Sequence, residues 1–479
     1  MHFPVIPLLV PFLLALSCQE TPAPAPEDPE EKMATVYTTN TATLRFFEEK
    51  VPVSAPVEDA FNVTLTGKTF QTVDGFGLAI TQASCFNLLR MSEADRNAFL
   101  TEIFSREEGI GSSLVRVCIG GSDFSMDEFT WCDRKGIENF DVHPLDEEYL
   151  FPILDQIYRI NPDVKIIGSP WSCPRWMKMT EDGKTPYDSW TGGRLNPVYY
   201  QDYATYFVKW IREMERRGYS VLAVTLQNEP LHRGNSMSLY MPWEDQRDFI
   251  KQAVGPAFRE AGIKAKILVY DHNYDVTDYT LKLLSDPDVS QYVAGSAWHN
   301  YGGNVGSLDL IHGRFPDKEI YFTEASIGTW NYNYESCLIN DFRDIFMGTL
   351  SRYGKGVTLW NLMLDDKRSP YRPGGCSTCF GAVTVASSTY SYKSLDRNTH
   401  YYNVAHCSKV IKSGAVRLET RGYQARGLSY QWYRNPDGSY GAILLNENKV
   451  DAKLIFSSGK SSVTVKVPPM AIQSVLWTD

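Results

Sequence analysis

Two glutamates each follow a short apolar run, a placement that core packing explains poorly. Glu229 lies in the stretch Thr225–Pro230 after the run Val221–Val224, and Glu324 lies in the stretch Glu319–Ser326. Apolar runs of this length are typical of buried parallel strands. Two carboxyl groups at two strand ends can cleave a glycosidic bond, because a protonated one assists the leaving oxygen while an ionised one attacks the anomeric carbon.

The two carboxyl groups must differ in protonation state to do this chemistry. The negative charge of one raises the pKa of the other, so we expect the pair to divide the two roles. We assign Glu229 as the acid/base and Glu324 as the nucleophile, and we expect Asn228, beside the acid, to hydrogen-bond the sugar 2-hydroxyl. For either glutamate alone, a solvated loop residue would be the favoured interpretation.

Apolar strands alternate with amphipathic helices through the middle of the chain. Helices are predicted from the capping box at Ser92 to Phe104, from Asn196 to Arg217, and from Pro242 to Glu260. Eight strands are predicted between and around them: Thr72–Leu78, Ser113–Ile119, Lys165–Ser169, Val221–Gln227, Lys266–Asp271, Val293–His299, Glu319–Glu324 and Gly356–Leu362.

This alternation predicts an α/β fold, a (β/α)8 TIM barrel, whose active site lies at the C-terminal ends of the strands. Glu229 then ends the fourth strand and Glu324 the seventh, so the two lie across the barrel mouth. The alternative is an open doubly wound sheet, which is less favoured because no glycine-rich phosphate loop follows the first strand.

Short strand-like segments replace the alternation after Ser394. They are Tyr440–Asn446, Ala452–Phe456, Val463–Val467 and Ser474–Trp477, with a turn at Asn435–Gly438, and they are typical of a β-sandwich. A β-rich segment near the N-terminus is expected to add strands to it. We therefore predict N-terminal strands of the sandwich over 34–70, the barrel over 71–400, and the C-terminal part of the sandwich over 401–479.

The N-terminal region is typical of a processing segment. Residues 1–17 are predicted to be a signal peptide, since the apolar run Val5–Leu16 is too short for a transmembrane helix. Ala15–Cys18 resembles a bacterial lipobox, so we expect a lipid on Cys18, an exported protein, and membrane association through this anchor only, at the cell surface or in the periplasm. Plain secretion is the alternative. The Pro-rich, acidic segment 18–33 predicts a flexible tether.

Composition argues against several partners. The formal net charge of −10 over 479 residues offers no basic surface to phosphates, so no nucleic acid partner is expected. Eight histidines without an H-E-x-x-H pattern argue against a metal hydrolase, and we expect no metal and no cofactor. Cys376 and Cys379 form a lone Cys-x-x-Cys, which predicts a local disulfide or free thiols rather than a zinc site.

Seven short motifs are spread through the predicted barrel: Asp74–Thr81, Arg116–Val117, Ser122–Ser125, Ser169–Lys178, Asn228–Pro230, Thr323–Ala325 and Trp360–Leu362. In their order and spacing they resemble glycoside hydrolase family 30, the family of lysosomal glucosylceramidase and microbial β-1,6-glucanases. The resemblance covers nearly the whole chain after the tether and implies a retaining mechanism and a barrel joined to a β-sandwich built from both chain ends.

The resemblance also implies roles around the nucleophile. Arg116 is expected to hold Glu324 or its neighbourhood by charge-assisted hydrogen bonds. His299 and Tyr301, at the end of the sixth strand, are expected to orient the nucleophile and stabilise charge. From the residues alone, Arg116 could equally be a barrel ion pair and His299 a structural histidine.

Further roles concern the sugar itself. The resemblance implies that Asp123 and Trp171 bind glucose hydroxyls in the −1 subsite and that Trp360 is the stacking platform of the sugar. From the residues alone, Asp123 could be a turn or helix cap, and both tryptophans could be core aromatics.

Two departures from glucosylceramidase bear on the substrate. Asn300 stands where that enzyme has an aromatic residue, and the loop Pro373–Phe380 lacks its Asn-bearing pattern. We therefore expect a retaining β-D-glucoside hydrolase acting on β-glucan, first a β-1,6-glucanase, next a glucosylceramidase-like or other β-glucosidase, and third a xylan-directed member of the family. A catalytically inactive carbohydrate-binding lipoprotein is the alternative from another class.

Overall fold

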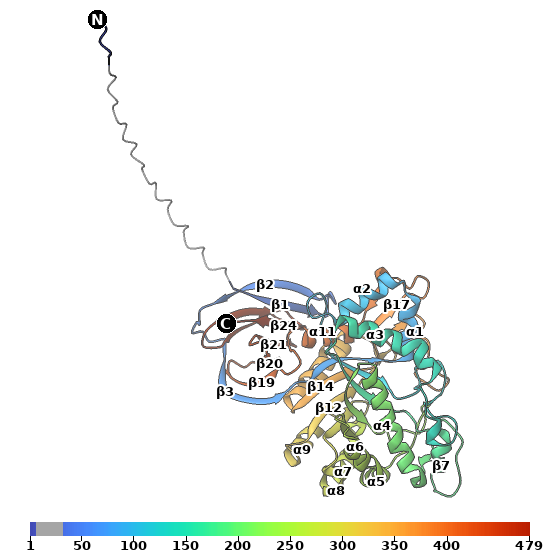
Figure 1. Cartoon of the computed structure of the whole chain (residues 1–479). Coiled ribbons are helices and arrows are strands. Elements are labelled where there is room, and N and C mark those ends of the chain that lie inside the picture. Colours follow the sequence, from blue (N-terminus) through green and yellow to red (C-terminus); the bar gives the residue numbers. More distant parts are fainter. Residues whose placement is uncertain (6–31) are drawn as a thin grey trace.

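The computed structural model describes residues 1–5 and 32–479 (Figure 1). Residues 6–17 of the predicted signal peptide and residues 18–31 of the predicted tether, Cys18 among them, lie outside the described residues. Within the described ranges, no helix combines the length and the hydropathy that crossing a bilayer requires.

Eight parallel strands close into a barrel, which confirms the predicted fold. Each predicted strand is present, two of them (Lys165–Ser169 and Glu319–Glu324) with the predicted bounds and the others with ends shifted by one to three residues. The pairing of the eighth strand with the first closes the ring, which excludes the open sheet. In order around the barrel the strands are β4 (Gly75–Ile80), β5 (Leu114–Cys118), β6 (Lys165–Ser169), β9 (Ser220–Thr225), β10 (Lys266–Asn273), β11 (Gly295–His299), β12 (Glu319–Glu324) and β14 (Gly354–Leu359).

The inside of the barrel is a packed core rather than a channel. Inward side chains from six of the strands form one buried cluster: Leu114, Ile167, Ala223, Leu268, Ala297 and Tyr321. Layers of this kind fill TIM barrels, and they leave only the two ends of the barrel for a ligand.

Helices cover the outside of the barrel, and the sequence signals mark where several of them begin. Ser92 caps α2 by accepting a hydrogen bond from the backbone N–H of Asp95 at 3.1 Å, as its capping box predicts. The helix predicted over Pro242–Glu260 is present as one continuous helical run, in which a π-helical stretch (Ile250–Val254) lies between α5 (Trp243–Phe249) and α6 (Gly255–Ala261). The other helices are α1 (Gln82–Arg90), α2 (Glu93–Phe104), α3 (Phe151–Ile160), α4 (Tyr200–Arg216), α7 (Thr277–Ser285), α8 (Pro287–Ser290), α9 (Ser307–Arg314) and α10 (Gly348–Ser351).

Short strands decorate the loops at the barrel mouth. They form three small sheets, which pair β7 with β8, β13 with β16, and β15 with β17 and β18. Their bounds are β7 (Lys178–Met179), β8 (Arg194–Leu195), β13 (Ile327–Gly328), β15 (Met363–Asp365), β16 (Cys379–Phe380), β17 (Val383–Val385) and β18 (Leu395–Arg397).

The second domain is a nine-stranded β-sandwich that uses both ends of the chain, as predicted. Its strands pair in the order β1-β2-β23-β22-β3-β19-β20-β21-β24, and β24 pairs with β1 to close the ring. Buried aromatics, among them Trp432, Phe456 and Trp477, fill its core. The strands are β1 (Met33–Asn40), β2 (Phe47–Ser54), β3 (Asn62–Thr72), β19 (Val416–Gly422), β20 (Leu428–Arg434), β21 (Tyr440–Asn446), β22 (Ala452–Ser457), β23 (Ser462–Val467) and β24 (Ala471–Trp477).

Helix α11 (Thr399–Ser408) lies between the two domains (Figure 1). All of its residues are buried, and it contacts both β4 of the barrel and β24 of the sandwich. The boundary that we predict at 400/401 falls inside this helix, and the one at 70/71 falls inside β3. Since α11 packs on both domains, it belongs to their shared interface.

Candidate active site

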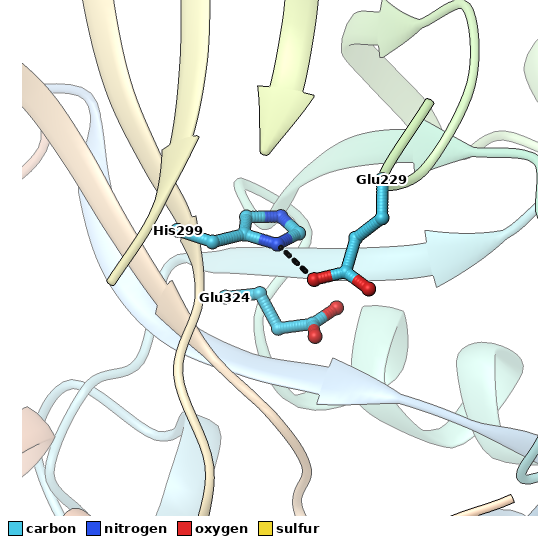
Figure 2. A group of neighbouring side chains, drawn as sticks. All are labelled: Glu229, His299 and Glu324. Carbon is cyan, nitrogen blue, oxygen red and sulfur yellow. Dashed lines mark hydrogen bonds and ion pairs between the residues drawn. The ribbon is translucent and has the colours of Figure 1, made fainter. Parts of the chain in front are cut away.

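The C-terminal ends of the barrel strands bring the two predicted glutamates together. Glu324 is the last residue of β12, and Glu229 lies just past the end of β9. One carboxyl oxygen of each, together with a ring nitrogen of His299, lie within 4.8 Å of one another (Figure 2). Retaining glycosidases hold their two carboxyl groups about 5–5.5 Å apart and inverting ones about 6.5–9.5 Å apart, so this separation favours the retaining class.

Both oxygens of Glu324 accept hydrogen bonds from fixed donors. Arg116 donates from Nη1 to Oε2 at 2.5 Å, and the Tyr301 hydroxyl donates to Oε1 at 3.0 Å. The oxygen of Tyr301 also lies 2.8 Å from the hydroxyl of Ser326. These donors fix the orientation of the carboxylate and stabilise its charged form.

The same guanidinium group organises the floor of the site. Arg116 is fully buried, and its Nη2 donates to Asn228 Oδ1 at 2.7 Å and to Asp271 Oδ2 at 2.8 Å. Arg116 therefore joins the nucleophile candidate, the residue beside the acid candidate, and a third carboxylate in one network.

Asp271 is a member of the site that sequence reasoning missed. Its carboxylate accepts hydrogen bonds from four side chains besides Arg116, those of Ser169, Thr225, Thr323 and His299. Burial by itself would raise the pKa of Asp271, but the charge of Arg116 and the hydrogen bond from His299 outweigh it and lower that pKa far below its ordinary value. The predicted fifth strand ends on this residue, and that position was the signal available in the sequence.

A β-bulge directs Asp271 into the site. Tyr270 and Asp271 have φ of 76° and 68°, in the left-handed region, and the pairing of β10 with β11 changes register between Tyr270 and His272. Bulges next to active sites commonly re-aim a side chain in this way. The backbone N–H of Glu229, itself at φ 45°, donates to the Asp271 carbonyl at 3.0 Å, so the bulge positions both residues.

His299 lies between two carboxyl groups and is fully buried. Its Nε2 is 3.1 Å from Asp271 Oδ1, and its Nδ1 is 3.2 Å from Glu229 Oε1 (Figure 2). Burial would lower the pKa of His299, but the charge of Glu324 and the hydrogen bonds to Asp271 and Glu229 outweigh it and raise that pKa to about 9. His299 is therefore an imidazolium at neutral pH that donates from both nitrogens.

The pKa directions of the two glutamates are the reverse of our expectation. For Glu229, burial raises the pKa but the hydrogen bond and charge of His299 outweigh it, so the pKa falls below its ordinary value. For Glu324, burial is the largest influence, and with the charge of Glu229 it raises the pKa despite His299 and Arg116. The expectation considered only the repulsion between the two carboxyl groups, and the histidine beside Glu229 reverses the result. These directions place a proton in the hydrogen bond between His299 Nδ1 and Glu229 Oε1, with the histidine favoured as its holder.

Glu229, His299 and Glu324 also have the spacing of a metal site within the described part of the chain. The donor set fits hydrogen bonding better, because Arg116 and Tyr301 already donate to both oxygens of Glu324. We therefore assign no metal to these residues.

A cleft of about 380 Å³ opens above this network, a size typical of small-ligand sites. The rings of Trp171 and Trp360 lie 5.1 Å apart, and the Arg116 guanidinium lies 4.9 Å from the Trp171 ring. The cleft is lined by Asp123, Trp171, Glu229, Asn235, Tyr301, Glu324, Ser326, Trp330, Trp360, Cys376, Thr378 and Cys379. Sequence reasoning gave no role to Asn235, Ser326, Trp330 or Thr378, which come from loops without a strand pattern.

Asp123 lies in the wall of the cleft and is buried. Burial, followed by the charge of Glu324, raises its pKa to about 8, although the backbone N–H of Cys376 opposes this by donating to its carboxyl group. Arg372 donates its backbone N–H to the Asp123 carbonyl at 2.7 Å, so the loop after β14 folds onto this residue. At neutral pH the Asp123 carboxyl group is mostly protonated and can donate a hydrogen bond.

Of the two alternatives for the Cys-x-x-Cys, the structure has the disulfide, between Cys376 and Cys379. Cys379 belongs to β16, which pairs with β13 through Gly328. This pairing joins the loop after β14 to the loop after β12, the disulfide braces the loop after β14, and together they form one rim of the cleft.

The comparisons with known proteins agree with this architecture. Residues 73–411 match the glycosyl hydrolase family 30 TIM-barrel domain, and residues 414–475 match the family's β-sandwich domain. An endo-1,6-beta-D-glucanase of Trichoderma harzianum is 32% identical over 414 residues, 81% of either chain, and the lysosomal acid glucosylceramidase of Mus musculus is 27% identical over 86% of this chain and 82% of its own.

A solved structure described as an endo-beta1,6-glucanase is 47% identical, with a TM-score of 0.89 over 93% of this chain and all of its own. The sandwich match begins where α11 has ended, and the barrel match contains every strand of the closed parallel barrel. Matches to both domains, over most of the chain and at these identities, show that the chain is an O-glycosyl hydrolase and belongs to glycosyl hydrolase family 30.

Proposed function

We propose that Glu324 is the nucleophile and Glu229 the acid/base of a double-displacement hydrolysis of β-glucosidic bonds. The supporting observation is the pair of carboxyl groups with oxygens within 4.8 Å, each with its own donors. Glu324 accepts from Arg116 and Tyr301, which suits a carboxylate that attacks. Glu229 faces His299, which suits a carboxyl group that gives and takes a proton.

The first step forms a covalent glycosyl-enzyme. A Glu324 oxygen bonds to the anomeric carbon while the bond to the leaving oxygen breaks, and that oxygen takes the proton shared by Glu229 and His299. In the second step Glu229 removes a proton from water, the water oxygen replaces Glu324 at the anomeric carbon, and the sugar leaves with its β configuration retained. Asn228, Asp123, Trp171 and Trp360 are proposed to bind the sugar in the −1 subsite.

We propose β-1,6-linked glucan as the substrate. The family members described as endo-1,6-β-glucanases support this, as does the rim of the cleft, where a disulfide-bonded polar loop replaces the pattern of glucosylceramidase. Glucosylceramide is the second candidate because the mouse glucosylceramidase also matches most of the chain.

A product profile tests both parts of the proposal. Purified protein is incubated with β-1,6-glucan, β-1,3-glucan, xylan and glucosylceramide, and the products are separated and their anomeric form recorded by NMR. We expect β-1,6-linked oligosaccharides released first in the β form. Release of the α form contradicts retention, and cleavage of glucosylceramide alone contradicts the glucan assignment.

The variant Glu324→Gln tests the nucleophile. We expect hydrolysis of an activated β-glucoside to fall by at least about 10³-fold, because the amide cannot form the glycosyl-enzyme. Glu335→Gln is the matched control, since Glu335 is exposed, begins the π-helical segment Glu335–Asn340 and is absent from the cleft lining. Unchanged hydrolysis in Glu324→Gln refutes the assignment.

We also propose export with a lipid on Cys18, on the sequence pattern given above. Detergent-phase partitioning and intact mass of the mature protein test it. We expect Cys18→Ser to move the protein to the aqueous phase with unchanged hydrolysis, and an unmodified Cys18 in the wild type contradicts the proposal.

A further inference from the structure

Trp330 is an exposed aromatic residue in the same cleft as the two catalytic glutamates. Its side chain is 55% exposed, whereas Trp171 and Trp360, which line the same cleft, are 2% and 4% exposed. An exposed indole beside a reaction centre offers a flat apolar face that a ligand can cover. The three tryptophans thus divide the cleft into a buried floor and an open rim.

The backbone beneath Trp330 holds its ring in place. A Cβ on Gly328 would lie 2.0 Å from Cζ3 and 2.5 Å from Cη2 of the indole, so the ring lies directly against the backbone at a position that only glycine allows. That Cβ would also meet the Thr378 carbonyl at 2.4 Å. The Trp330 ring therefore packs on the Gly328 backbone, and the backbone of the neighbouring loop at Thr378 packs on Gly328 as well.

Backbone hydrogen bonds join that support to the neighbouring loop, which a disulfide braces. Gly328 pairs with Cys379 in the β13–β16 ladder, and the backbone N–H of Thr329 donates to the Thr378 carbonyl at 3.0 Å. Cys379 is bonded to Cys376. A flat, exposed ring on a braced support has the properties of a stacking platform, since little conformational freedom is lost when a ligand covers it.

The direction of the cleft indicates which sugar would use this platform. The sugar that bonds to Glu324 must reach the buried carboxylate and therefore occupies the floor beside Trp171 and Trp360. The sugar that departs must leave toward solvent, past the exposed rim. Trp330 is the exposed tryptophan of that rim among the residues that line the cleft.

We propose that Trp330 is the stacking platform for the sugar on the leaving-group side of the scissile bond and thereby sets the preference for a sugar leaving group. This inference rests on the proposed function. Removing the ring is expected to lower kcat/KM for oligosaccharides about 10-fold, which corresponds to about 1.4 kcal/mol of lost stacking and burial.

The test compares a substrate that fills this subsite with one that leaves it empty. Trp330→Ala and Trp330→Phe are assayed on β-1,6-linked glucotetraose and on β-gentiobiosyl fluoride, whose leaving group has no ring. We expect Trp330→Ala to lose about 10-fold on the tetraose and less than about 2-fold on the fluoride, and Trp330→Phe to recover most of the loss. Tyr334→Ala is the control, since Tyr334 is 40% exposed nearby and is absent from the cleft lining.

Transfer to an added sugar gives a second readout, because an acceptor must bind in the same subsite. With gentiobiose added to the fluoride reaction, we expect Trp330→Ala to lower the ratio of transfer to hydrolysis. An equal loss on both substrates, or unchanged transfer, overturns the inference. If the wild type turns over the fluoride but no β-1,6-linked substrate, the proposed substrate fails, and transfer to a panel of other sugars still decides the role of Trp330.

Discussion

Replacing Asp271 with asparagine is expected to change both stability and the pH dependence of activity. The carboxylate is fully buried and accepts from Arg116 at 2.8 Å, from Thr225 and Thr323 at 2.6 Å each, and from His299 at 3.1 Å. Removing one partner from a buried ion pair costs about 3–5 kcal/mol, because the other charge is left without compensation. We expect Asp271→Asn to lose stability of this order.

The pH dependence follows from His299. Its pKa rises from 6.5 to about 9 in the fold, which corresponds to about 3 kcal/mol in favour of the imidazolium. Such a raised pKa stabilises the folded state fully below pH 6.5, and the contribution is lost as the pH rises through about 9. Asp271 supplies one charge and one hydrogen bond to this shift. We therefore expect the stability gap between the wild type and Asp271→Asn to be larger at pH 6 than at pH 9.5.

Activity should report the same change. The His299–Glu229 pair holds the acid proton, so the basic limb of kcat/KM for a glucan substrate is expected near pH 9 in the wild type. In Asp271→Asn we expect that limb at least about one pH unit lower, and kcat/KM at the optimum about 10–100-fold lower, since hydrogen bonds to charged groups contribute about 1.5–3 kcal/mol. Differential scanning calorimetry and pH–rate profiles measure the two effects.

Asp146→Asn is the matched control. Asp146 is also a buried carboxyl group, but it accepts from Gln82 and Trp131 and contacts none of the residues of the site. Burial raises its pKa to about 7, so an amide replaces a group that is already half protonated at neutral pH. We expect its pH–rate limbs to stay in place. If the basic limb of the pH–rate profile does not move in Asp271→Asn, the argument that His299 and Glu229 share a proton is refuted. If the limb moves equally in Asp271→Asn and Asp146→Asn, the shift does not arise from the groups of the active site.

Three further predictions concern the acid, the nucleophile and the rim. Glu229→Gln is expected to slow hydrolysis of glucan about 10²–10⁴-fold but hydrolysis of β-gentiobiosyl fluoride much less. Added azide should restore turnover of this variant and give a β-glycosyl azide, detected by mass spectrometry and NMR. An α-glycosyl azide contradicts the assignment of Glu229 as the acid/base. Because burial raises the pKa of Glu324, the acid limb of kcat/KM should lie above pH 4.5, and a limb below that value in a pH–rate profile contradicts the direction. Replacing Cys376 and Cys379 with serine should raise KM for β-1,6-linked glucotetraose several-fold with little change in the thermal midpoint of unfolding, since the disulfide braces the rim rather than the core. A large fall in the thermal midpoint with an unchanged KM contradicts this role of the disulfide.

The sequence was sufficient to predict the barrel and both glutamates because the signals are local. Each apolar run has the length of a strand, and the polar residue that ends the run lies at the barrel mouth. This position follows from the end of the strand alone and does not depend on contacts elsewhere in the chain. Glu229 and Glu324 are found this way. Asp271 ends a predicted strand in the same manner but is missed, because its role depends on donors from five other strands, β5, β6, β9, β11 and β12, rather than on its own neighbours.

Other features depend on contacts that no local pattern encodes. The pKa directions of the two glutamates follow from where the His299 ring lies, and that position follows from β11 and from the bulge at Tyr270 and Asp271. The rim of the cleft depends on the pairing of β13, in the loop after β12, with β16, in the loop after β14. The sequence contains the cysteines and the tryptophan of this rim, but no local pattern in it shows that they lie next to one another in the fold.

The closed ring of the sandwich has a mechanical consequence. β1, the first strand in the described part of the chain, is hydrogen-bonded on one side to β2 and on the other to β24, antiparallel in both cases. A force applied to the chain ahead of Met33 along the axis of β1 would load both ladders lengthwise, so that many hydrogen bonds share it at once. The barrel is joined to this anchor point through α11 and β3 rather than through the loaded strand. A pull on the N-terminal end would therefore be borne by the sandwich, and the residues at the barrel mouth would keep their geometry under load.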